Sequence, residues 1–287
     1  MPEKMLICTD LDRTLIPNGP QPESPAARQY FSALISRPEV KLAYVSGRHR
    51  KLVQSAITNY CLPVPDFVIG DVGTTIYHLD GPGNWERQTD WEEHIARDWS
   101  GKTHADLKLM LNDIHALRLQ ESSKQNHFKL SFYIPLQADR QALTALMEKR
   151  FHEAGVKASL IWSINEPAGV GLLDILPASA SKLHAIQALM QMLGFDYSNT
   201  IFSGDSGNDI EVLASPVPAV MVANSSPDVQ ELATLLASEN GCSDKLYIAQ
   251  GSFSGMNGNY SAGILEGIVH YFPATRAWIA PEKSESL

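Results

Sequence analysis

The feature that most constrains this chain is a short apolar run that ends in two aspartates. Residues 5–8 read as a buried strand, and Asp10, Asp12 and Thr14 follow it. Because side chains alternate along an extended chain, Asp10 and Asp12 are expected on one side at the strand's carboxyl end, where open α/β sheets bind ligands. Carboxylates so close repel each other unless a divalent cation compensates them or one stays protonated. The pair therefore predicts a metal site or a general acid beside a nucleophile, with a simple turn after a strand as the alternative.

Composition limits the classes of partner. The 287 residues carry a formal net charge of −9, which argues against a nucleic acid or an anionic membrane surface. We expect no signal peptide at the N-terminus, and no apolar run reaches the length that spans a bilayer. The three cysteines lie far apart, so neither a disulfide framework nor a zinc cluster is expected. A reducing cytoplasm is the predicted compartment.

Much of the chain alternates predicted strands and helices. Residues 40–45, 66–70 and 199–203 read as strands in a pattern typical of a parallel sheet covered by helices. Two stretches rich in Gly and Pro, at 80–84 and 165–171, interrupt this pattern. They enclose a segment with its own strands and helices, which indicates an inserted unit.

The predicted fold class is α/β, with a Rossmann-like parallel-sheet core and an inserted α/β cap. The core is assigned to residues 1–82 and 175–287, and the cap to residues 83–174. Within the cap, residues 92–117 are expected to form one amphipathic helix and residues 128–134 a strand. A lid over the carboxyl edge of the core sheet would exclude water from a reaction, whereas an ordinary structural insertion is the alternative.

Polar residues recur where other predicted elements begin or end. These positions are Ser46 with Gly47 and Arg48, Lys182, and Asp205 with Asp209. Because parallel strands bring their carboxyl ends to one edge, we expect them to meet Asp10 and Asp12. Carboxylates from two strands can share Mg²⁺, and a hydroxyl with backbone N–H groups at a strand-to-helix turn can bind an anion. Together they predict a phosphoryl-transfer site with a carboxylate nucleophile, although Lys182 alone would be read as an exposed lysine.

Four ordered motifs resemble those of the haloacid dehalogenase-like (HAD) phosphohydrolases. They are Asp-Leu-Asp-Arg-Thr at 10–14, Val-Ser-Gly-Arg at 45–48, Lys182, and Gly-Asp-Ser-Gly-Asn-Asp at 204–209. The insertion lies between the second and third motifs and so resembles the C2-type cap of that superfamily. Arg13 stands where relatives often have Gly or Asn. Within the superfamily the chain is most similar to the sucrose-6-phosphate phosphatase family, on residues 42–48, 72–78, 128–131 and 262–267.

The resemblance implies a role for each acidic residue. Asp10 would attack phosphorus and become an aspartyl phosphate, while Asp12 would protonate the leaving sugar oxygen and then activate water. For that role we expect the pKa of Asp12 to lie nearer the working pH than that of a free aspartate. Asp10, Asp205 and the backbone carbonyl of Asp12 would hold Mg²⁺. Asp209 would be a further ligand or would support the ligands from behind.

The resemblance also implies the residues that bind substrate. The predicted phosphate-binding set is Thr14, Ser46, Gly47, Arg48, Lys182 and Asn208. Lys129 in the cap is a candidate for sugar binding, with a solvated strand lysine as the alternative.

The implied substrate is a small-molecule sugar phosphate, with sucrose 6-phosphate as the first choice and functional coupling to a sugar-phosphate synthase. Mannosylfructose phosphate, mannosyl-3-phosphoglycerate and a hexose phosphate are alternative substrates. A sugar phosphomutase on the same fold is an alternative enzyme, and a receiver-type module without catalysis is an alternative of a different class.

Overall fold

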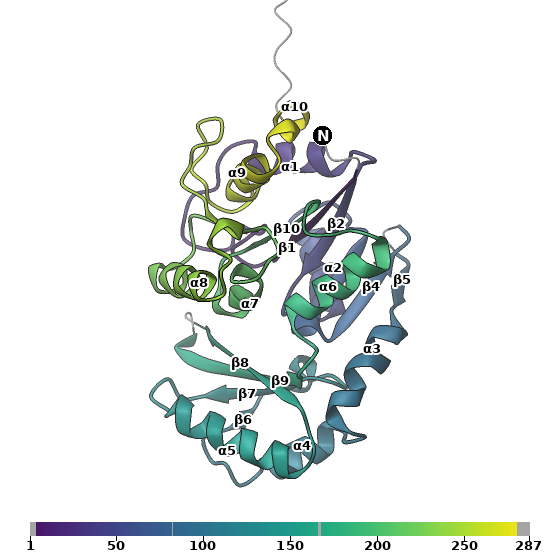
Figure 1. The fold of residues 1–287 in the computed structure, drawn as a ribbon, viewed down its shortest axis with the longest axis vertical. Coiled ribbons are helices and arrows are strands. Elements are labelled where there is room, and N and C mark those ends of the chain that lie inside the picture. Colours follow the sequence, from purple (N-terminus) through teal and green to yellow (C-terminus); the bar gives the residue numbers. More distant parts are fainter. Residues whose placement is uncertain (1–3, 82, 166–167, 280–287) are drawn as a thin grey trace, which may run out of the picture.

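The computed structural model describes residues 4–81, 83–165 and 168–279, which form two sheets (Figure 1). The larger sheet has the strand order β12-β11-β10-β1-β2-β3-β4-β5. Its strands are β1 (Met5–Thr9), β2 (Val40–Val45), β3 (Phe67–Gly70), β4 (Thr75–Leu79), β5 (Trp85–Arg87), β10 (Thr200–Gly204), β11 (Ala219–Met221) and β12 (Leu246–Ile248). The six strands from β12 to β3 pair in parallel, while β4 and β5 are antiparallel. The predicted parallel α/β core is confirmed.

Helices cover both faces of this sheet because its strands are apolar on both sides. Met5 and Ile7 of β1 enter one hydrophobic cluster, and Leu6 and Cys8 enter the other, as the twofold period of a strand requires. The first cluster is closed by α1 (Ala27–Ile35), α2 (Arg50–Asn59), α9 (Ser261–Tyr271) and α10 (Arg276–Ile279). The second is closed by α6 (Lys182–Leu193), α7 (Ile210–Leu213) and α8 (Pro227–Glu239).

The smaller sheet has the order β6-β7-β9-β8 and is antiparallel. Its elements are β6 (Arg118–Leu119), β7 (Leu130–Ile134), β8 (Ala158–Asn165) and β9 (Val170–Pro177), with helices α3 (Thr89–Ala96), α4 (His104–Met110) and α5 (Arg140–Glu153). In Figure 1 the sheet, in teal, faces the core, and α4 and α5 lie on its outer side. The inserted unit therefore presents a sheet to the core.

The single helix predicted over 92–117 is wrong. Helix α3 is followed by a short 3₁₀ turn, and Ser100 and Gly101 then adopt left-handed φ values of 50° and 78°. Thr103 begins α4 with a capping box, in which its side chain accepts from the Asp106 N–H and Asp106 accepts from the Thr103 N–H. The apolar period continues across this break, but left-handed backbone cannot continue a right-handed helix.

The chain passes between the two sheets later than predicted. Strand β5 pairs with β4 in the larger sheet, although the predicted cap begins at residue 83. Strand β9 pairs with β8 up to Pro177, beyond the predicted return at residue 175. We propose that the cap spans residues 88–177, because strand pairing, rather than Gly and Pro content, defines which sheet a segment belongs to.

Candidate active site

Lys182 lies at the centre of a buried cluster of charges. As the first residue of α6 it directs its Nζ to Asp10 Oδ1 at 2.9 Å, Asp209 Oδ1 at 2.7 Å and Asn208 Oδ1 at 3.0 Å. Its side chain is only 1% exposed, so the interpretation as an ordinary surface lysine is wrong. Parallel pairing of β1 with β10 brings Asp10 and the 204–209 loop together, since both follow the carboxyl ends of these strands.

Three carboxylates of this cluster are close enough to share a metal ion. Asp10, Asp205 and Asp209 are buried, and one oxygen from each lies within 4.8 Å of the others. Carboxylate oxygens are the ligands that Mg²⁺ prefers, so the donor set fits a hard divalent cation. The Thr14 hydroxyl donates to Asp205 Oδ1 at 3.1 Å, so it orients a candidate ligand.

Asp209 already has a full set of hydrogen bonds. Its Oδ2 accepts from the backbone N–H groups of Asp205 and Ser206, both at 3.1 Å, and from the Ser206 hydroxyl at 3.2 Å. Its Oδ1 accepts from Lys182. These contacts close the 205–209 loop on itself. Of the two roles predicted for Asp209, they favour support of the loop over direct ligation.

The cluster carries more negative than positive charge in a buried environment. Burial raises the pKa of Asp10 well above its usual range, and Lys182 only partly offsets this. Burial, followed by the charge of Asp209, raises the pKa of Asp205 to about 7. A divalent cation held by these carboxylates would favour their charged forms. The electrostatics of the site therefore agree with its oxygen-rich geometry.

Asp12 is held by Arg48 in a two-point ion pair. Arg48 Nε donates to Asp12 Oδ2 at 2.7 Å, one terminal nitrogen of its guanidinium donates to Oδ1 at 2.6 Å, and Asn18 donates to Oδ1 at 2.7 Å. Burial alone would raise the pKa of Asp12, but these partners hold it below its usual range. The expected shift toward working pH is therefore wrong for this arrangement. Arg48 was predicted to bind phosphate, and in this structure its guanidinium forms an ion pair with Asp12.

The turn after β2 carries the predicted anion-binding groups. Ser46 is 1% exposed, and its hydroxyl accepts from the Arg48 N–H at 3.2 Å. The Val72 N–H donates to the Ser46 carbonyl at 3.1 Å, which ties this turn to the segment after β3. Gly73 in that segment has φ +105°, and a Cβ there would lie 2.4 Å from the Ser181 carbonyl carbon. The glycine therefore lets this segment contact the start of α6, beside Lys182.

Lys129 joins the cap to the core. Its Nζ lies 3.4 Å from the Gly47 carbonyl oxygen in the core and 3.9 Å from Asp174 Oδ1 in the cap. The residue is 4% exposed, which excludes the solvated lysine. A second bridge runs from Asn126 Nδ2 to Thr74 Oγ1 at 2.9 Å. The cap therefore contacts the core directly at the predicted phosphate-binding turn.

Two residues near the site were missed or left without a role. Arg13 adopts φ +57°, a conformation that Gly and Asn enter easily, and its Nε lies 3.6 Å from Asp205 Oδ2. Asp71, at φ +52°, is buried, and the charge of Lys129 lowers the pKa of its carboxyl group. Asp71 directly follows β3, and that position at a carboxyl strand end is the signal that could have identified it.

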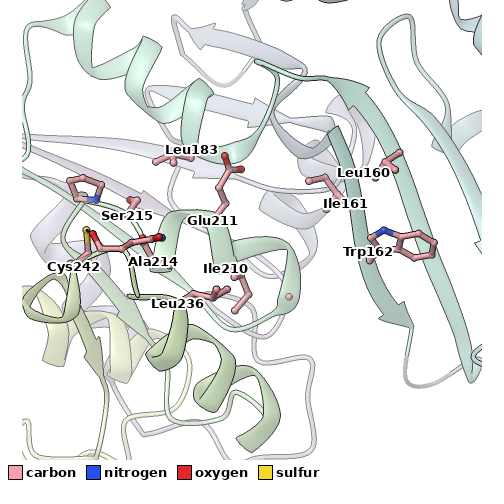
Figure 2. Close-up of a pocket in the computed structure, with 13 residues that line it drawn as sticks. Leu160, Ile161, Trp162, Leu183, Ile210, Glu211, Ala214, Ser215, Leu236 and Cys242 are labelled. Atoms are coloured by element: carbon pink, nitrogen blue, oxygen red, sulfur yellow. Dashed lines mark hydrogen bonds between the residues drawn. The ribbon is translucent and has the colours of Figure 1, made fainter. Parts of the chain in front are cut away.

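An apolar cavity of about 570 Å³ lies beside the 207–209 loop. Figure 2 shows the cap strand β8, with Leu160, Ile161 and Trp162, on one side and Ile210 and Glu211 of α7 on the other. Its walls are mostly apolar among the residues described, whereas the charged groups gather around Lys182. The cavity is therefore a poor place for a phosphate.

Known proteins resemble the chain over nearly its whole length. The sucrose-6F-phosphate phosphohydrolase family model matches residues 3–272. A protein of Nitrosococcus oceani, named only as a HAD-like hydrolase, is 52% identical over 287 residues, all of this chain and 76% of that protein. Sucrose-phosphatase 1 of Nicotiana tabacum is 31% identical over 277 residues, 93% of this chain. The chain spans 59% of that plant protein's length.

A solved structure agrees with these sequence matches. The sucrose-phosphatase of Synechocystis sp. PCC6803, in complex with sucrose and phosphate, superposes with a TM-score of 0.73 at 26% identity. The match covers 94% of this chain and 98% of that one. Because both the family model and the fold extend across the core and the cap, the chain belongs to the sucrose-6F-phosphate phosphohydrolase family, a family of phosphoric monoester hydrolases within the HAD-like superfamily.

Proposed function

We propose that the protein is an Mg²⁺-dependent phosphatase of a glycosyl phosphate, with sucrose 6-phosphate as the first candidate substrate. The observation that carries this proposal is the buried contact of Lys182 with Asp10 and Asp209, beside Asp205 and beneath the cap. A carboxylate nucleophile, a fixed positive charge and oxygen ligands are the parts that phosphoryl transfer needs. Membership in the sucrose-6F-phosphate phosphohydrolase family supports the substrate class.

In the proposed reaction Asp10 attacks phosphorus, the bond to the sugar oxygen breaks, and an aspartyl phosphate forms. Asp12 gives its proton to the departing oxygen and later accepts one from the water that hydrolyses the acyl phosphate. Mg²⁺ held by Asp10, Asp205 and the Asp12 carbonyl would neutralise charge on the phosphoryl oxygens. Because Arg48 favours the charged form of Asp12, substrate binding must loosen that pair before Asp12 donates.

The remaining predicted residues have proposed binding roles. Ser46 and the Gly47 N–H would hold the phosphoryl oxygens because they follow β2, the strand beside β1. Lys182 and Asn208 would hold them as well, because Lys182 contacts Asp10 and Asn208 contacts Lys182. Thr14 and Arg48 would act through Asp205 and Asp12, the carboxylates that they contact. Lys129 would touch the sugar from the cap side.

The decisive experiment is phosphate release from a panel of glycosyl phosphates, with Mg²⁺ and with a chelator. We expect sucrose 6-phosphate or a close relative, such as mannosylfructose phosphate, to be hydrolysed best. The chelator should stop the reaction, Mg²⁺ should restore it, and Ca²⁺ should restore it poorly because its looser coordination misplaces the reacting groups. Full activity in chelator with no bound metal would refute the metal site.

The same panel separates the alternative functions. A phosphomutase would convert glucose 1-phosphate or mannose 1-phosphate to its 6-phosphate isomer instead of releasing phosphate. A receiver-type module would be phosphorylated once without turnover. Repeated release of free phosphate would exclude both alternatives for that substrate.

We also propose a cytoplasmic location and functional coupling to a sugar-phosphate synthase that would supply the substrate. The three cysteines are unpaired, which agrees with a reducing compartment. Among residues 4–81, 83–165 and 168–279, no helix combines the length and the apolar character needed to cross a bilayer. Fractionation of cells and co-purification with the synthase would test these two points.

A further inference from the structure

Asp71 is a buried carboxylate held in a conformation that is unfavourable for an aspartate. It is 4% exposed, and both Asp71 and Val72 have left-handed φ values, 52° and 62°. Such conformations are strained for residues other than Gly and persist only where the surroundings hold them. Strain of this kind gathers at ligand sites, so the position warrants a functional explanation.

The groups that face Asp71 come from both the core and the cap. Lys129 and Asn126 of the cap and His49 of the core lower the pKa of its carboxyl group, and Asp174 of the cap raises it. Lys129 Nζ in turn lies 3.9 Å from Asp174 Oδ1, so the buried ammonium attracts both carboxylates. Burial raises the pKa of Asp71, and Lys129 and Asn126 offset this only in part. The fold alone gains little from such a group, since an unbalanced buried charge destabilises.

This charged group lies beside the proposed phosphate-binding turn. The Asp71 N–H donates to the Arg48 carbonyl at 3.0 Å, and the Val72 N–H donates to the Ser46 carbonyl at 3.1 Å. Lys129 Nζ reaches the Gly47 carbonyl of the same turn from the cap. The Asp71 backbone and the Lys129 ammonium thus both contact the turn proposed to hold phosphate, so a group attached to that phosphate would lie near them.

We infer that Asp71 is a specificity-determining residue whose carboxylate accepts a hydrogen bond from a hydroxyl of the sugar ring next to the phosphate. Lys129 and Asp174 complete this subsite and provide a second donor and a second acceptor for neighbouring hydroxyls. The inference rests on the proposed function and deepens it. A site built to hydrogen-bond a hydroxyl rejects an analogue that lacks it, because the buried partner is left unpaired.

The test compares glycosyl phosphates with p-nitrophenyl phosphate, which carries no hydroxyls. Asp71→Gly removes the carboxylate and suits the left-handed backbone, and Asp71→Asn removes only the charge in a residue that tolerates this conformation. Glu86→Gln, an exposed position on β5, is the matched control. We expect Asp71→Gly to lower kcat/KM for the best glycosyl phosphate by about 10- to 100-fold and for p-nitrophenyl phosphate by less than about threefold.

Deoxy analogues of the best substrate distinguish sugar binding from a purely structural role, because a structural role would leave the discrimination between individual hydroxyls unchanged. The wild type should discriminate strongly against one deoxy analogue, and Asp71→Gly should lose that discrimination while keeping its discrimination at other hydroxyls. Equal losses on both substrate classes, or unchanged discrimination across the series, would overturn the inference while leaving the phosphatase intact. A wild type that hydrolyses p-nitrophenyl phosphate but no glycosyl phosphate would overturn the proposed function, and this inference with it.

Discussion

At the scale of single residues, the site is defined by how a few buried charges are paired. Lys182 is shared by Asp10 and Asp209, so none of these three charges is isolated from a counter-charge. Asp12 is paired instead with Arg48, outside this cluster. Two adjacent carboxylates of one motif thus have pKa values shifted in opposite directions, raised for Asp10 and lowered for Asp12. These directions are opposite to what the proposed roles need, since a nucleophile must be ionised and an acid protonated. A cation held at Asp10 would favour its charged form, and loosening of the Arg48 pair would favour protonation of Asp12.

Replacement of the nucleophile is the first prediction. Asp10→Asn should abolish phosphate release, because a neutral amide cannot form the acyl phosphate, while Lys182 keeps its contact with Asp209. Phosphate release and thermal denaturation are measured together, with the exposed Asp80→Asn as the control. Substantial turnover by a folded Asp10→Asn variant would contradict the mechanism.

The second prediction concerns the pH dependence of stability through Asp205. Its pKa is about 7 in the folded chain, above the ordinary value of 3.8, so the folded state binds the proton more tightly. The stability that this group contributes is full below the ordinary pKa and is lost as pH rises through about 7. In chelator, wild type should therefore lose stability between about pH 5 and about pH 8, and Asp205→Asn should lose less.

Urea denaturation at the two pH values measures this difference. Added Mg²⁺ should stabilise wild type at the higher pH, since a bound cation replaces the proton, and should stabilise Asp205→Asn less. Identical pH dependence in the two proteins would show that Asp205 is not the titrating group.

At the scale of elements, the site depends on close contact between the start of α6 and the segment after β3. Ser181 caps α6 by accepting from the His184 N–H, and Lys182 follows as its first residue. Gly73 packs against the Ser181 backbone from the other side. The position of the Lys182 ammonium is therefore set by a backbone contact between two core segments.

The third prediction tests this contact. Gly73→Ala should destabilise the fold by more than about 3 kcal/mol, because the added methyl meets backbone atoms and the φ of +105° is strained. Gly101→Ala is the control, since its φ is +78° but no atom lies within 4 Å of the added carbon. Gly101→Ala should lower the free energy of unfolding by only about 1–2 kcal/mol, because backbone strain is the only cost there. Equal costs in urea denaturation would mean that the Gly73 contact is unimportant.

At the scale of the whole molecule, the cap sheet covers the carboxyl edge of the core sheet. Lys129 connects the cap to the Ser46–Gly47 turn, and Asn126 connects it to Thr74 in the segment after β3. Asp10, Ser46, Lys182 and Asp205 are each at most 5% exposed in this arrangement. A sugar phosphate of any size must therefore pass between the cap and the core, which ties substrate choice to cap residues.

The fourth prediction concerns the cap lysine. Lys129→Ala should raise KM for the preferred disaccharide phosphate by about 10-fold, because a buried polar contact is lost, and should change p-nitrophenyl phosphate hydrolysis by less than about threefold. Lys124→Ala, an exposed lysine of the same cap segment, is the control. Equal losses on both substrates would place Lys129 in the catalytic centre or in folding.

Apolar runs and the polar residues at their ends were enough to predict a parallel core sheet and the edge of it that carries the chemistry. Strands β1, β2 and β10 are apolar runs that end in polar residues, and parallel pairing brings such ends together whatever their separation in the chain. Asp10, Lys182 and Asp205 could therefore be assigned to one site without coordinates. The break between α3 and α4 and the domain boundaries could not, because local backbone angles and strand partners leave little trace in apolar periodicity.

The pairing of the charges, by contrast, could be seen only in the folded molecule. Arg48 meets Asp12 across 36 residues within the core, and Lys129 of the cap meets the Gly47 carbonyl of the core across 82, so both contacts depend on how distant segments pack. The left-handed conformation of Asp71 is likewise invisible in the sequence, since Gly is the residue that ordinarily signals it. Periodicity reports which face of an element is buried, whereas side-chain pairing depends on distances that only the packed molecule establishes.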